Sequence, residues 1–267
     1  MSSQSPLRRL FSPKSVAVIG GGVWCRSVIE QLFKIGYKGK IFPVHPSKKE
    51  ILGLKYFKDL EEVPIEIDAS FVGVNRNITI EVIKKLNDLN AGGAVCFASG
   101  FLEAEDDKQG SGKLQKSLIE AAGDMPILGP NCYGFINYLD RSVLWPDQHG
   151  GKAVDRGVAI LTQSSNLAIN ITMQTRGLPI SYIMSVGNQA SLGFPEIGMY
   201  LLSDPRVTAL GLHIEGIGDV RAFEELATKA RKLGKSIVVL KVGKSAEARK
   251  AAQSHTASLA GNAQGAK

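Results

Sequence analysis

Short, continuous runs of hydrophobic residues alternate along the chain with longer segments in which hydrophobic residues recur at helical spacing. The runs predict β-strands at residues 15–22, 39–46, 68–74 and 94–101. The spaced segments predict helices at residues 28–37, 78–93 and 112–124. Because strands and helices alternate, we expect a parallel sheet whose two faces are both covered by helices.

The same alternation restarts after a polar interval. Residues 126–137 predict a short strand followed by a loop, and the polar stretch with Pro and Gly beyond them predicts a linker at residues 141–156. Further strands are predicted at residues 157–163, 180–188, 207–216 and 236–243, with helices at residues 165–177, 194–205 and 219–234. We therefore predict two α/β domains, at residues 1–140 and 157–267, each built on an open parallel sheet.

Composition and charge narrow the class of protein. The chain has 267 residues, 44% of them hydrophobic, and a net charge of +7. We expect no membrane span and no signal peptide, because apolar runs of the required length are missing. The positive charge is spread out, which argues against nucleic-acid binding and suits a small polyanionic ligand. Three scattered cysteines are typical of reduced thiols, so we expect a cytoplasmic protein.

A run of three glycines follows the first predicted strand, in the segment SVAVIGGG. Glycines at this point let the backbone approach a phosphate, although a tight turn alone would also use them. Gly20 and Gly22 fit the dinucleotide pattern G-x-G-x-x-G, but Cys25 replaces its third glycine. After the second strand, Lys48 and Lys49 stand where a nicotinamide site needs an acidic residue. This favours a ligand with an additional phosphate, while both lysines are also typical surface charges.

Nine short motifs follow one another across nearly the whole chain. They are SVAVIGGG, GKIFPVHPSK, CFASGF, ILGPNCYGFIN, ILTQSSNLAIN, SVGNQA, SDPRVTALGLHIEGIGD, IVVLKVGKS and AAQSHTASLAG. In this order the chain resembles the nucleoside-diphosphate-forming acyl-CoA synthetases, relatives of the succinyl-CoA synthetase α subunit. The GPNC-G and SHT-SLAG motifs are specific, whereas the glycine loop alone is not. The resemblance implies a Rossmann-like CoA-binding domain followed by a flavodoxin-like domain with an open parallel sheet.

The resemblance implies that coenzyme A lies along the first domain. Its phosphates would contact Gly20, Gly21, Gly22 and Val23, its adenosine or diphosphate Pro46, Ser47 and Lys48, and its pantetheine arm Val74, Asn75, Ser99, Gly100 and Phe101. An ordinary strand-to-helix turn would also explain Ser99 and Gly100. Asn131 lies in a loop toward the active centre, where it either contacts the ligand or braces the loop. We expect Cys132 to be a small buried side chain rather than a nucleophile.

The resemblance makes His255 the residue that is transiently phosphorylated, within a loop of small side chains. Such a histidine needs one neutral nitrogen as the nucleophile and an acceptor that holds the other nitrogen. The family counterpart of Glu215 holds and orients this histidine, and the alternative for Glu215 is a capping or surface role. His213 lies two residues away, and we expect it to pack rather than to catalyse.

A phosphate site is predicted where the first strand of the second domain turns into a helix. Backbone N–H groups there, with Ser164, Ser165 and Asn166, suit an anion, although plain helix capping is compatible with the same residues. Two positions depart from the family pattern. Glycine usually stands at the position of Ser165, and an Asp usually follows Asn188, so we give Asn188 only a minor phosphate role.

The implied reaction is the reversible conversion of acyl-CoA, ADP and phosphate to carboxylic acid, ATP and CoA, through an acyl phosphate and phosphorylated His255. Mg²⁺ would accompany the nucleotide, but the sequence shows no carboxylate cluster for a metal and no trace of the family's ATP-grasp domain. We expect the chain to be the N-terminal portion or one subunit of a larger enzyme, inactive by itself and oligomeric. An ATP-grasp domain or subunit would be its partner.

Two other classes of function remain open from the sequence. One is a non-catalytic CoA-binding or regulatory module, against which the retained His255 and Glu215 argue. The other is an NAD(P)-dependent oxidoreductase, against which the missing ribose-binding acid argues. The acid substrate is not defined by the motifs. The aromatic residues Tyr133, Phe135 and Trp145 suit an aryl or longer acyl group, and core packing explains them equally well.

Overall fold

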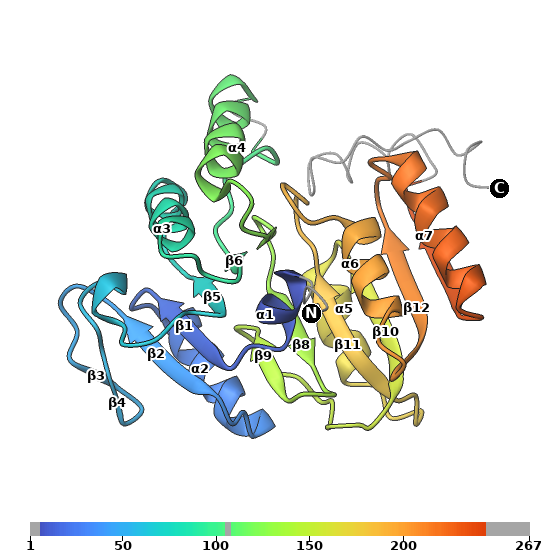
Figure 1. The fold of residues 1–267 in the computed structure, drawn as a ribbon, viewed down its shortest axis with the longest axis horizontal. Helices are drawn as coiled ribbons and strands as arrows, with labels where there is room; N and C mark the ends of the chain where they lie inside the picture. The colour runs from blue at the N-terminus through green and yellow to red at the C-terminus, as the bar shows by residue number, and fades with distance from the viewer. Residues whose placement is uncertain (1–5, 105–107, 244–267) are drawn as a thin grey trace, which may run out of the picture.

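The computed structural model describes residues 6–104 and 108–243. Two β-sheets lie side by side, with helices packed around them and the short helix α1 (Pro6–Phe11) between them (Figure 1). The predicted alternation of strands and helices is confirmed in both halves of the chain, which is therefore an α/β protein. Every strand predicted from a continuous hydrophobic run is present, and each ends one to five residues before the predicted limit.

The first sheet is parallel and Rossmann-like. Its strands lie in the order β2 (Lys40–Val44), β1 (Ser15–Ile19), β5 (Ala69–Val72), β6 (Ala94–Cys96) and β7 (Ile127–Leu128). The chain moves from β1 to β2 on one side and then to β5 on the other side, so the direction of winding reverses between β1 and β5. Open α/β sheets bind ligands beside such a reversal, at the carboxyl ends of the strands.

Three helices cover the first sheet: α2 (Val23–Ile35), α3 (Arg76–Asp88) and α4 (Lys108–Ala122). Helix α2 buries Cys25, Val28, Ile29 and Leu32, which recur at helical spacing and therefore form one face. It ends at Gly36, whose φ of +78° is accessible to glycine and whose N–H bonds back to the last turn. Helices α3 and α4 lie together on the opposite side (Figure 1).

The second sheet is mixed rather than parallel throughout, which corrects the expectation. Its strands lie in the order β13 (Ser236–Lys241), β12 (Val207–Ile214), β10 (Gly157–Thr162), β11 (Ile180–Ser185), β8 (Gly134–Asn137) and β9 (Ser142–Leu144). The first four are parallel, whereas β8 pairs antiparallel with both β11 and β9. Helices α5 (Ser165–Thr172), α6 (Phe194–Leu202) and α7 (Val220–Lys232) cover this sheet.

Strands β8 and β9 come from a segment in which the sequence predicts a loop and part of a linker. Both strands are buried along their whole length, so they show no alternation of polar and apolar residues. With four and three residues they are also too short for periodicity to separate them from a loop. The second sheet therefore begins before the predicted linker, and its first two strands precede its parallel part in the chain.

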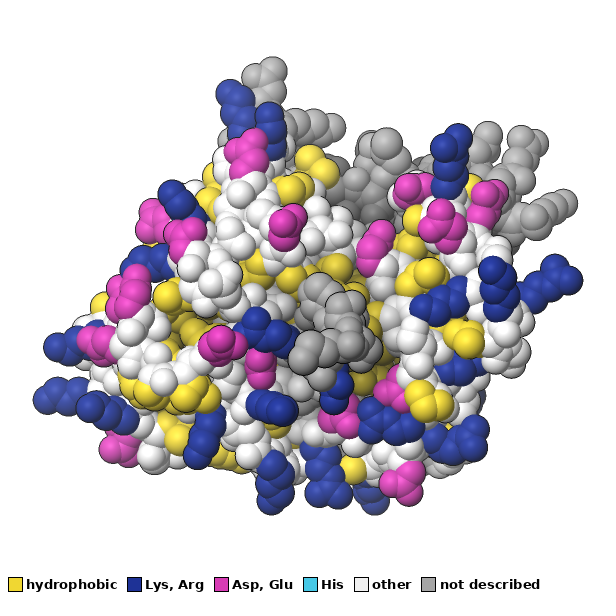
Figure 2. All heavy atoms as spheres, viewed as in Figure 1, with side chains coloured by type: hydrophobic (Ala, Val, Ile, Leu, Met, Phe, Trp, Pro, Cys, Tyr) yellow, Lys and Arg dark blue, Asp and Glu magenta, His cyan; other side chains and the backbone are white. Residues whose placement is uncertain are grey.

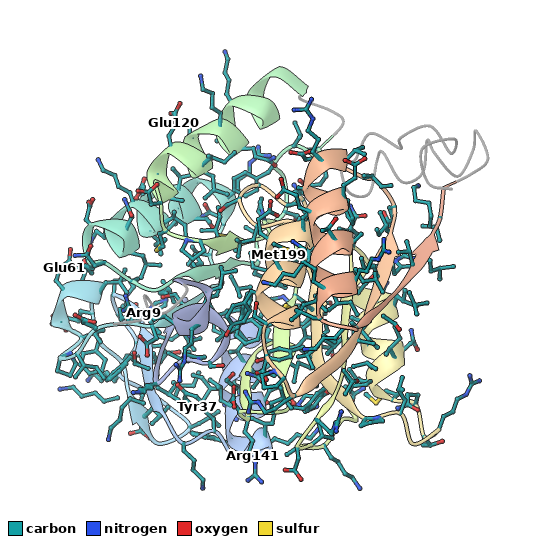
Figure 3. All side chains as sticks on the ribbon, turned by 45° about the vertical axis from the view of Figure 1, so that its right-hand side comes forward. Arg9, Tyr37, Glu61, Glu120, Arg141 and Met199 are labelled. Carbon is teal, nitrogen blue, oxygen red and sulfur yellow. The ribbon has the colours of Figure 1, made fainter. Side chains whose placement is uncertain are left out.

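Four small elements had no counterpart in the sequence prediction: α1, the hairpin of β3 (Glu50–Ile51) and β4 (Leu54–Lys55), and the 3₁₀ turn η1 (Leu60–Glu62). Helix α1 is structurally important because Leu10 and Phe11 are fully buried. The ring of Phe11 meets Phe135 of β8 edge to face, with 5.2 Å between centroids. Arg9, on the same helix, lies between the two halves (Figure 3) and donates from Nε to Asp68 Oδ1 over 2.8 Å.

One hydrophobic core crosses from the first sheet to the second. It includes Val16 and Phe71 from the first sheet and Phe135, Trp145 and Leu161 from the second half. A smaller cluster lies under α3 and α4. Because the larger core is shared, the two sheets are held as neighbours by apolar burial, and the loops at their carboxyl ends are brought to a common region.

Candidate functional site

The glycine loop that follows β1 leaves no space for side chains at its first position. Gly20 has φ +127°, and a Cβ there would lie 2.6 Å from the carbonyl oxygen of Gly73. Gly22, by contrast, has nothing within 4 Å and an ordinary φ of −81°, and it caps α2 without a side chain. Cys25 closes the loop from behind and donates to Ile19 O over 3.5 Å. Burial raises the pKa of Cys25 to about 11, so this thiol is neutral and structural.

A cavity of about 440 Å³ opens beside this loop. Four predicted CoA contacts line it, namely Gly20, Gly21, Pro46 and Val74. The adjacent turn is ordered by His45, whose Nδ1 accepts from the backbone N–H groups of Ser47 and Lys48, both over 3.2 Å. The ammonium of Lys48 donates to the carbonyl of Gly21, so this lysine lies against the glycine loop. Val23 and Gly22 do not line this cavity, and Val23 is 68% exposed.

A second cavity of about 500 Å³ lies on the other side of Val74. It is lined by three predicted pantetheine contacts, Val74, Asn75 and Ser99, by Asn131, and by Ser165 from the predicted phosphate site. The structure thus brings residues of the two predicted sites together around one space. Val74 lines both cavities, so the predicted CoA contacts follow a path from one cavity to the next.

Two of the predicted pantetheine residues have evident structural roles. Asn75 caps α3, because its Oδ1 accepts from the N–H groups of Asn77 and Ile78, both over 3.1 Å. Gly100 has φ +91°, and its carbonyl accepts from Arg76 Nη1 over 2.7 Å. Phe101 is fully buried in the core beneath α3 and α4 and lines neither of the two cavities.

Asn131 joins the loops of the two halves. Its φ is +58°, and its Nδ2 donates to Asn188 Oδ1 over 3.4 Å. Asn188 in turn donates from its backbone N–H to Pro130 O over 2.9 Å and from Nδ2 to Glu103 Oε2. Cys132 is buried, as expected, and burial raises its pKa well above the ordinary value for a thiol. This arrangement fits bracing by Asn131, which also lines the second cavity.

The predicted phosphate residues stand at the start of α5. Ser164 is the N-cap residue, and its Oγ accepts from Leu167 N over 3.3 Å. The hydroxyl of Ser165 lies 2.7 Å from that of Ser185 at the end of β11, and it lines the second cavity. Asn166 is exposed. Capping and anion binding are compatible here, because a helix start still offers unpaired N–H groups.

Glu215 follows β12 at the carboxyl end of the second sheet. Its backbone N–H and that of Gly216 donate to Gln163 Oε1 over 2.7 and 3.1 Å, a role for Gln163 that the sequence did not predict. The Glu215 carboxylate oxygen Oε2 is buried and has no hydrogen-bond partner among the described residues. A buried acceptor without a hydrogen bond lowers the stability of the fold unless another group donates to it. His255, the predicted phosphorylated residue, lies outside the described residues.

His213 is held at the same sheet edge by Thr162, whose Oγ1 lies 3.1 Å from its Nδ1. Burial lowers the pKa of His213, and the nearby Glu215 charge opposes this shift only in part. The neutral, half-buried ring fits the predicted packing role. Within residues 6–104 and 108–243, no group of three or more His, Cys, Asp or Glu side chains is arranged to hold a metal ion.

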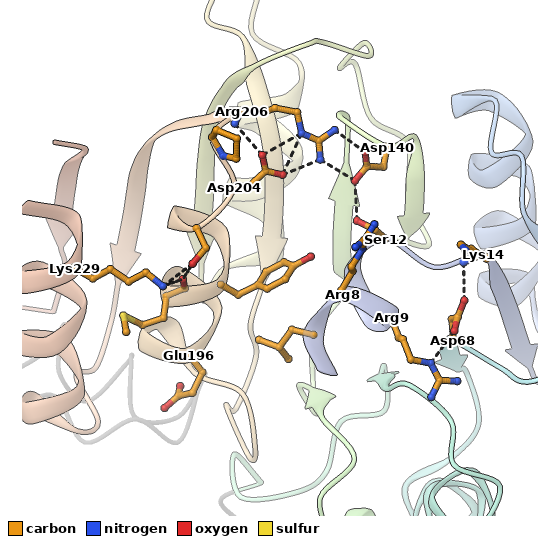
Figure 4. A pocket seen from close by; sticks show the side chains of 15 residues that line it. Arg8, Arg9, Ser12, Lys14, Asp68, Asp140, Glu196, Asp204, Arg206 and Lys229 are labelled. Atoms are coloured by element: carbon orange, nitrogen blue, oxygen red, sulfur yellow. Dashed lines mark hydrogen bonds and ion pairs between the residues drawn. The ribbon is translucent and has the colours of Figure 1, made fainter. Parts of the chain in front are cut away.

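A further cavity, of about 1200 Å³, contains none of the predicted site residues (Figure 4). It lies between α1 and α6, and its upper rim is an ion-pair network in which Arg206 contacts Asp140 over 2.7 Å and Asp204 over 2.8 Å. Burial raises the pKa of Asp140, but hydrogen bonds from Arg206, Ser12 and Asn137 outweigh it and hold this pKa below its usual value. These paired charges join the turn between β8 and β9 to the segment just before β12.

Charged side chains elsewhere are mixed. Figure 2 shows Lys and Arg interspersed with Asp and Glu over one face, without a large patch of either sign. In the described part of the chain, no helix has the length and apolar character needed to cross a membrane.

Each half of the chain matches the model of a known protein family. Residues 14–138 match a CoA binding domain, and residues 155–267 match a succinyl-CoA ligase like flavodoxin domain. The chain therefore carries a CoA-binding domain and a succinyl-CoA ligase-like domain, in this order. In it, the glycine loop and both cavities lie in or beside the CoA-binding domain, and Glu215 lies in the succinyl-CoA ligase-like domain.

Individual relatives are similar to this chain over almost its whole length. The chain is 32% identical over 269 residues to trans-feruloyl-CoA synthase FCS1 of an unknown prokaryotic organism, covering 97% of this chain and 38% of that protein. It is 33% identical to the α subunit of ADP-forming acetate–CoA ligase II of Pyrococcus furiosus, covering 94% of this chain and 55% of that subunit. The chain therefore spans between about a third and somewhat over half of the length of these relatives.

Solved structures show the same domain arrangement. The fold superimposes on the dinucleotide-forming acetyl-coenzyme A synthetase 1 of Ca. Korarchaeum cryptofilum, solved with phosphate and ADP, with a TM-score of 0.84 and 29% identity. The match covers 97% of this chain and 56% of that one. A structure from Pyrococcus horikoshii matches with a TM-score of 0.81 and 30% identity over 96% of this chain and 58% of that one.

Proposed function

We propose that this chain is the CoA-binding and phosphoryl-transferring portion of an ADP-forming acyl-CoA synthetase, an acid–thiol ligase. The complete enzyme would convert acyl-CoA, ADP and phosphate to a carboxylic acid, ATP and CoA, and would run in reverse. Phosphate attacks the thioester carbonyl, free CoA leaves, and the resulting acyl phosphate passes its phosphoryl group to His255. An ATP-grasp domain or subunit, with Mg²⁺, then exchanges this group with ADP or ATP.

One observation carries the proposal: the second cavity is lined by residues of both predicted sites. Asn75, Ser99 and Asn131 come from the CoA side, and Ser165 comes from the phosphate side at the start of α5. A reaction between a CoA thioester and phosphate needs such a shared space, because the two reactants must be held in contact. The two cavities that meet at Val74 suit an elongated ligand with a nucleotide end and a reactive end.

The proposed role of Glu215 rests on its unpaired buried oxygen. A neutral imidazole donates from one ring nitrogen while the other nitrogen attacks phosphorus. The buried Oε2 of Glu215 is an acceptor without a described partner, and we assign it to the donating nitrogen of His255. This contact would keep the attacking nitrogen unprotonated and would stabilise the imidazole after the phosphoryl group arrives.

We further propose a division into a CoA-binding domain at residues 1–140 and a phosphohistidine domain at residues 157–267, joined by residues 141–156. The family matches at residues 14–138 and 155–267 support it, although β8 and β9 add to the second sheet. The three cysteines are free and buried, which suits a reducing compartment such as the cytoplasm. Relatives named for ferulate, acetate and 4-hydroxybutyrate leave several acid classes open for this chain.

Calorimetric titration of the 267-residue chain separates this proposal from its rivals. We expect CoA to bind and NAD not to bind, because the turn after β2 carries Lys48 rather than a carboxylate. NAD binding without CoA binding would mean an oxidoreductase. The chain combined with its ATP-grasp part should then convert a panel of carboxylic acids to CoA thioesters with ATP. CoA binding without turnover of any acid in that complete enzyme would leave only the regulatory module.

A further inference from the structure

Three aromatic rings form one side of the second cavity. They belong to Trp24 at the start of α2, Phe97 after β6 and Tyr133 before β8, and we call them the aromatic wall. Ring centroids are 5.5 Å apart for Trp24 and Phe97, 5.8 Å for Phe97 and Tyr133, and 6.3 Å for Trp24 and Tyr133. Each ring therefore contacts the other two, and together they present one continuous apolar surface.

The aromatic wall is held from behind and open in front. Phe71 supports Phe97 at 5.6 Å, and the fully buried Trp145 meets Tyr133 edge to face at 5.3 Å. Trp24 nevertheless remains 42% exposed. A tryptophan so exposed beside a cavity leaves a large apolar area in contact with water, and burying that area under a ligand would be favourable. Core packing therefore accounts for the buried rings of Phe71 and Trp145, but it does not account for the exposed face of Trp24.

The wall lies at the reactive end of the path proposed for CoA. The first cavity, beside Gly20 and Gly21, would take the nucleotide end, and Val74 separates it from the second. Ser165, where phosphate would enter, lines the second cavity together with the wall. A thioester carbonyl placed beside Ser165 would hold its acyl group within this cavity. An acetyl group can contact the aromatic wall only through one methyl group, whereas a planar aromatic ring can stack against several of its rings.

We propose that the acid handled by this site carries a planar aromatic group that stacks on Trp24, Phe97 and Tyr133. This inference rests on the proposed function, because the wall meets an acyl group only if CoA lies along the two cavities. The rings recognise the aromatic face, and Trp24 contributes the largest accessible area among them. Asn75, Ser99 and Asn131 supply hydrogen-bonding groups for the polar pantetheine arm.

The test compares three thioesters that differ only in the acyl group: acetyl-CoA, benzoyl-CoA and cyclohexanecarbonyl-CoA. The last matches benzoyl in size but has no aromatic face. Dissociation constants are measured by calorimetry with the 267-residue chain. Trp24→Ala and Tyr133→Leu remove parts of the wall. Phe33→Ala is the matched control, because Phe33 is a 49% exposed aromatic residue on the same helix that does not line the cavity. Thermal melts check that each variant folds.

We expect benzoyl-CoA to bind about tenfold more tightly than acetyl-CoA and about threefold more tightly than cyclohexanecarbonyl-CoA. Trp24→Ala should bring the first ratio below about threefold, and Phe33→Ala should leave it unchanged. Equal binding of all three thioesters would overturn the inference while leaving CoA binding, and so the proposed function, intact. A benzoyl preference that survives in both wall variants would also overturn it. Failure to bind CoA itself would instead refute the proposed function.

Discussion

Two glycines of the same loop should differ strongly in the stability that substitution by alanine costs. Gly20 is required by the fold, because it has φ +127° and an added Cβ would lie 2.6 Å from the Gly73 carbonyl oxygen. Strain and overpacking together should cost roughly 2–5 kcal/mol of unfolding free energy in Gly20→Ala. Gly22 has φ −81° and open space around it, so Gly22→Ala should cost less than about 1 kcal/mol.

The second variant isolates ligand binding from folding. If CoA phosphates approach this loop, a methyl group at Gly22 occupies space that the ligand needs. We expect Gly22→Ala to weaken CoA binding at least about tenfold, equivalent to one charge-assisted hydrogen bond, at nearly unchanged stability. Urea unfolding and calorimetric titration measure the two quantities separately. Full CoA affinity in a folded Gly22→Ala protein would refute a phosphate contact at Gly22, and wild-type stability of Gly20→Ala would refute the steric argument.

Three further predictions concern stability and reactivity. Arg206→Met should lower the unfolding free energy by about 1 kcal/mol at pH 7, because it removes the ion pair with Asp140. The pair holds the pKa of Asp140 below its ordinary value, so the loss should shrink as the pH falls below that ordinary value, and an equal loss in strong acid would contradict this. Burial, aided by the Lys34 charge, lowers the pKa of His149 to about 4. The unfolding free energy measured in urea should therefore fall by up to ~3 kcal/mol between about pH 6.5 and pH 4. An equally steep fall with pH in His149→Phe would contradict this prediction. Iodoacetamide at pH 8 should not label Cys25, Cys96 or Cys132 in the native protein, because burial raises the pKa of all three thiols. Mass spectrometry before and after unfolding measures the labelling.

Long elements were predictable because their residues carry a periodic signal. The fully buried strand β1 is a continuous apolar run, and α2 repeats its buried residues at helical spacing. Helix α1 and strand β9 were not predictable, since six and three residues give periodicity too little length. Their position depends on distant contacts such as Phe11 with Phe135. The antiparallel edge of the second sheet was missed for the same reason.

The candidate site could be predicted where motifs mark it and not where tertiary packing creates it. Ser99 and Asn131 stand in quoted motifs, whereas Val74 and Asn75 were named from their position under the resemblance, and all four line one cavity. Trp24 and Arg76 line the same cavity from outside the quoted motifs, and Phe97 lines it from within CFASGF without having been predicted as a contact. Their grouping follows from the convergence of α2, β6 and α3 at one sheet edge. Gln163, which orders the backbone at Glu215, stands in a quoted motif, but its long-range contact has no local signature.

In the proposed reaction, His255 carries a phosphoryl group between the CoA side and the nucleotide side. The most direct test is incubation of the complete enzyme with Mg²⁺ and ATP labelled at the γ-phosphate, without CoA or acid. We predict an acid-labile, alkali-stable label on His255, which is lost in His255→Ala and retained in His213→Gln, and which is discharged when CoA and a carboxylic acid are added. Turnover of the acid in His255→Ala at the wild-type rate, or a label that stays on that variant, would contradict the claim.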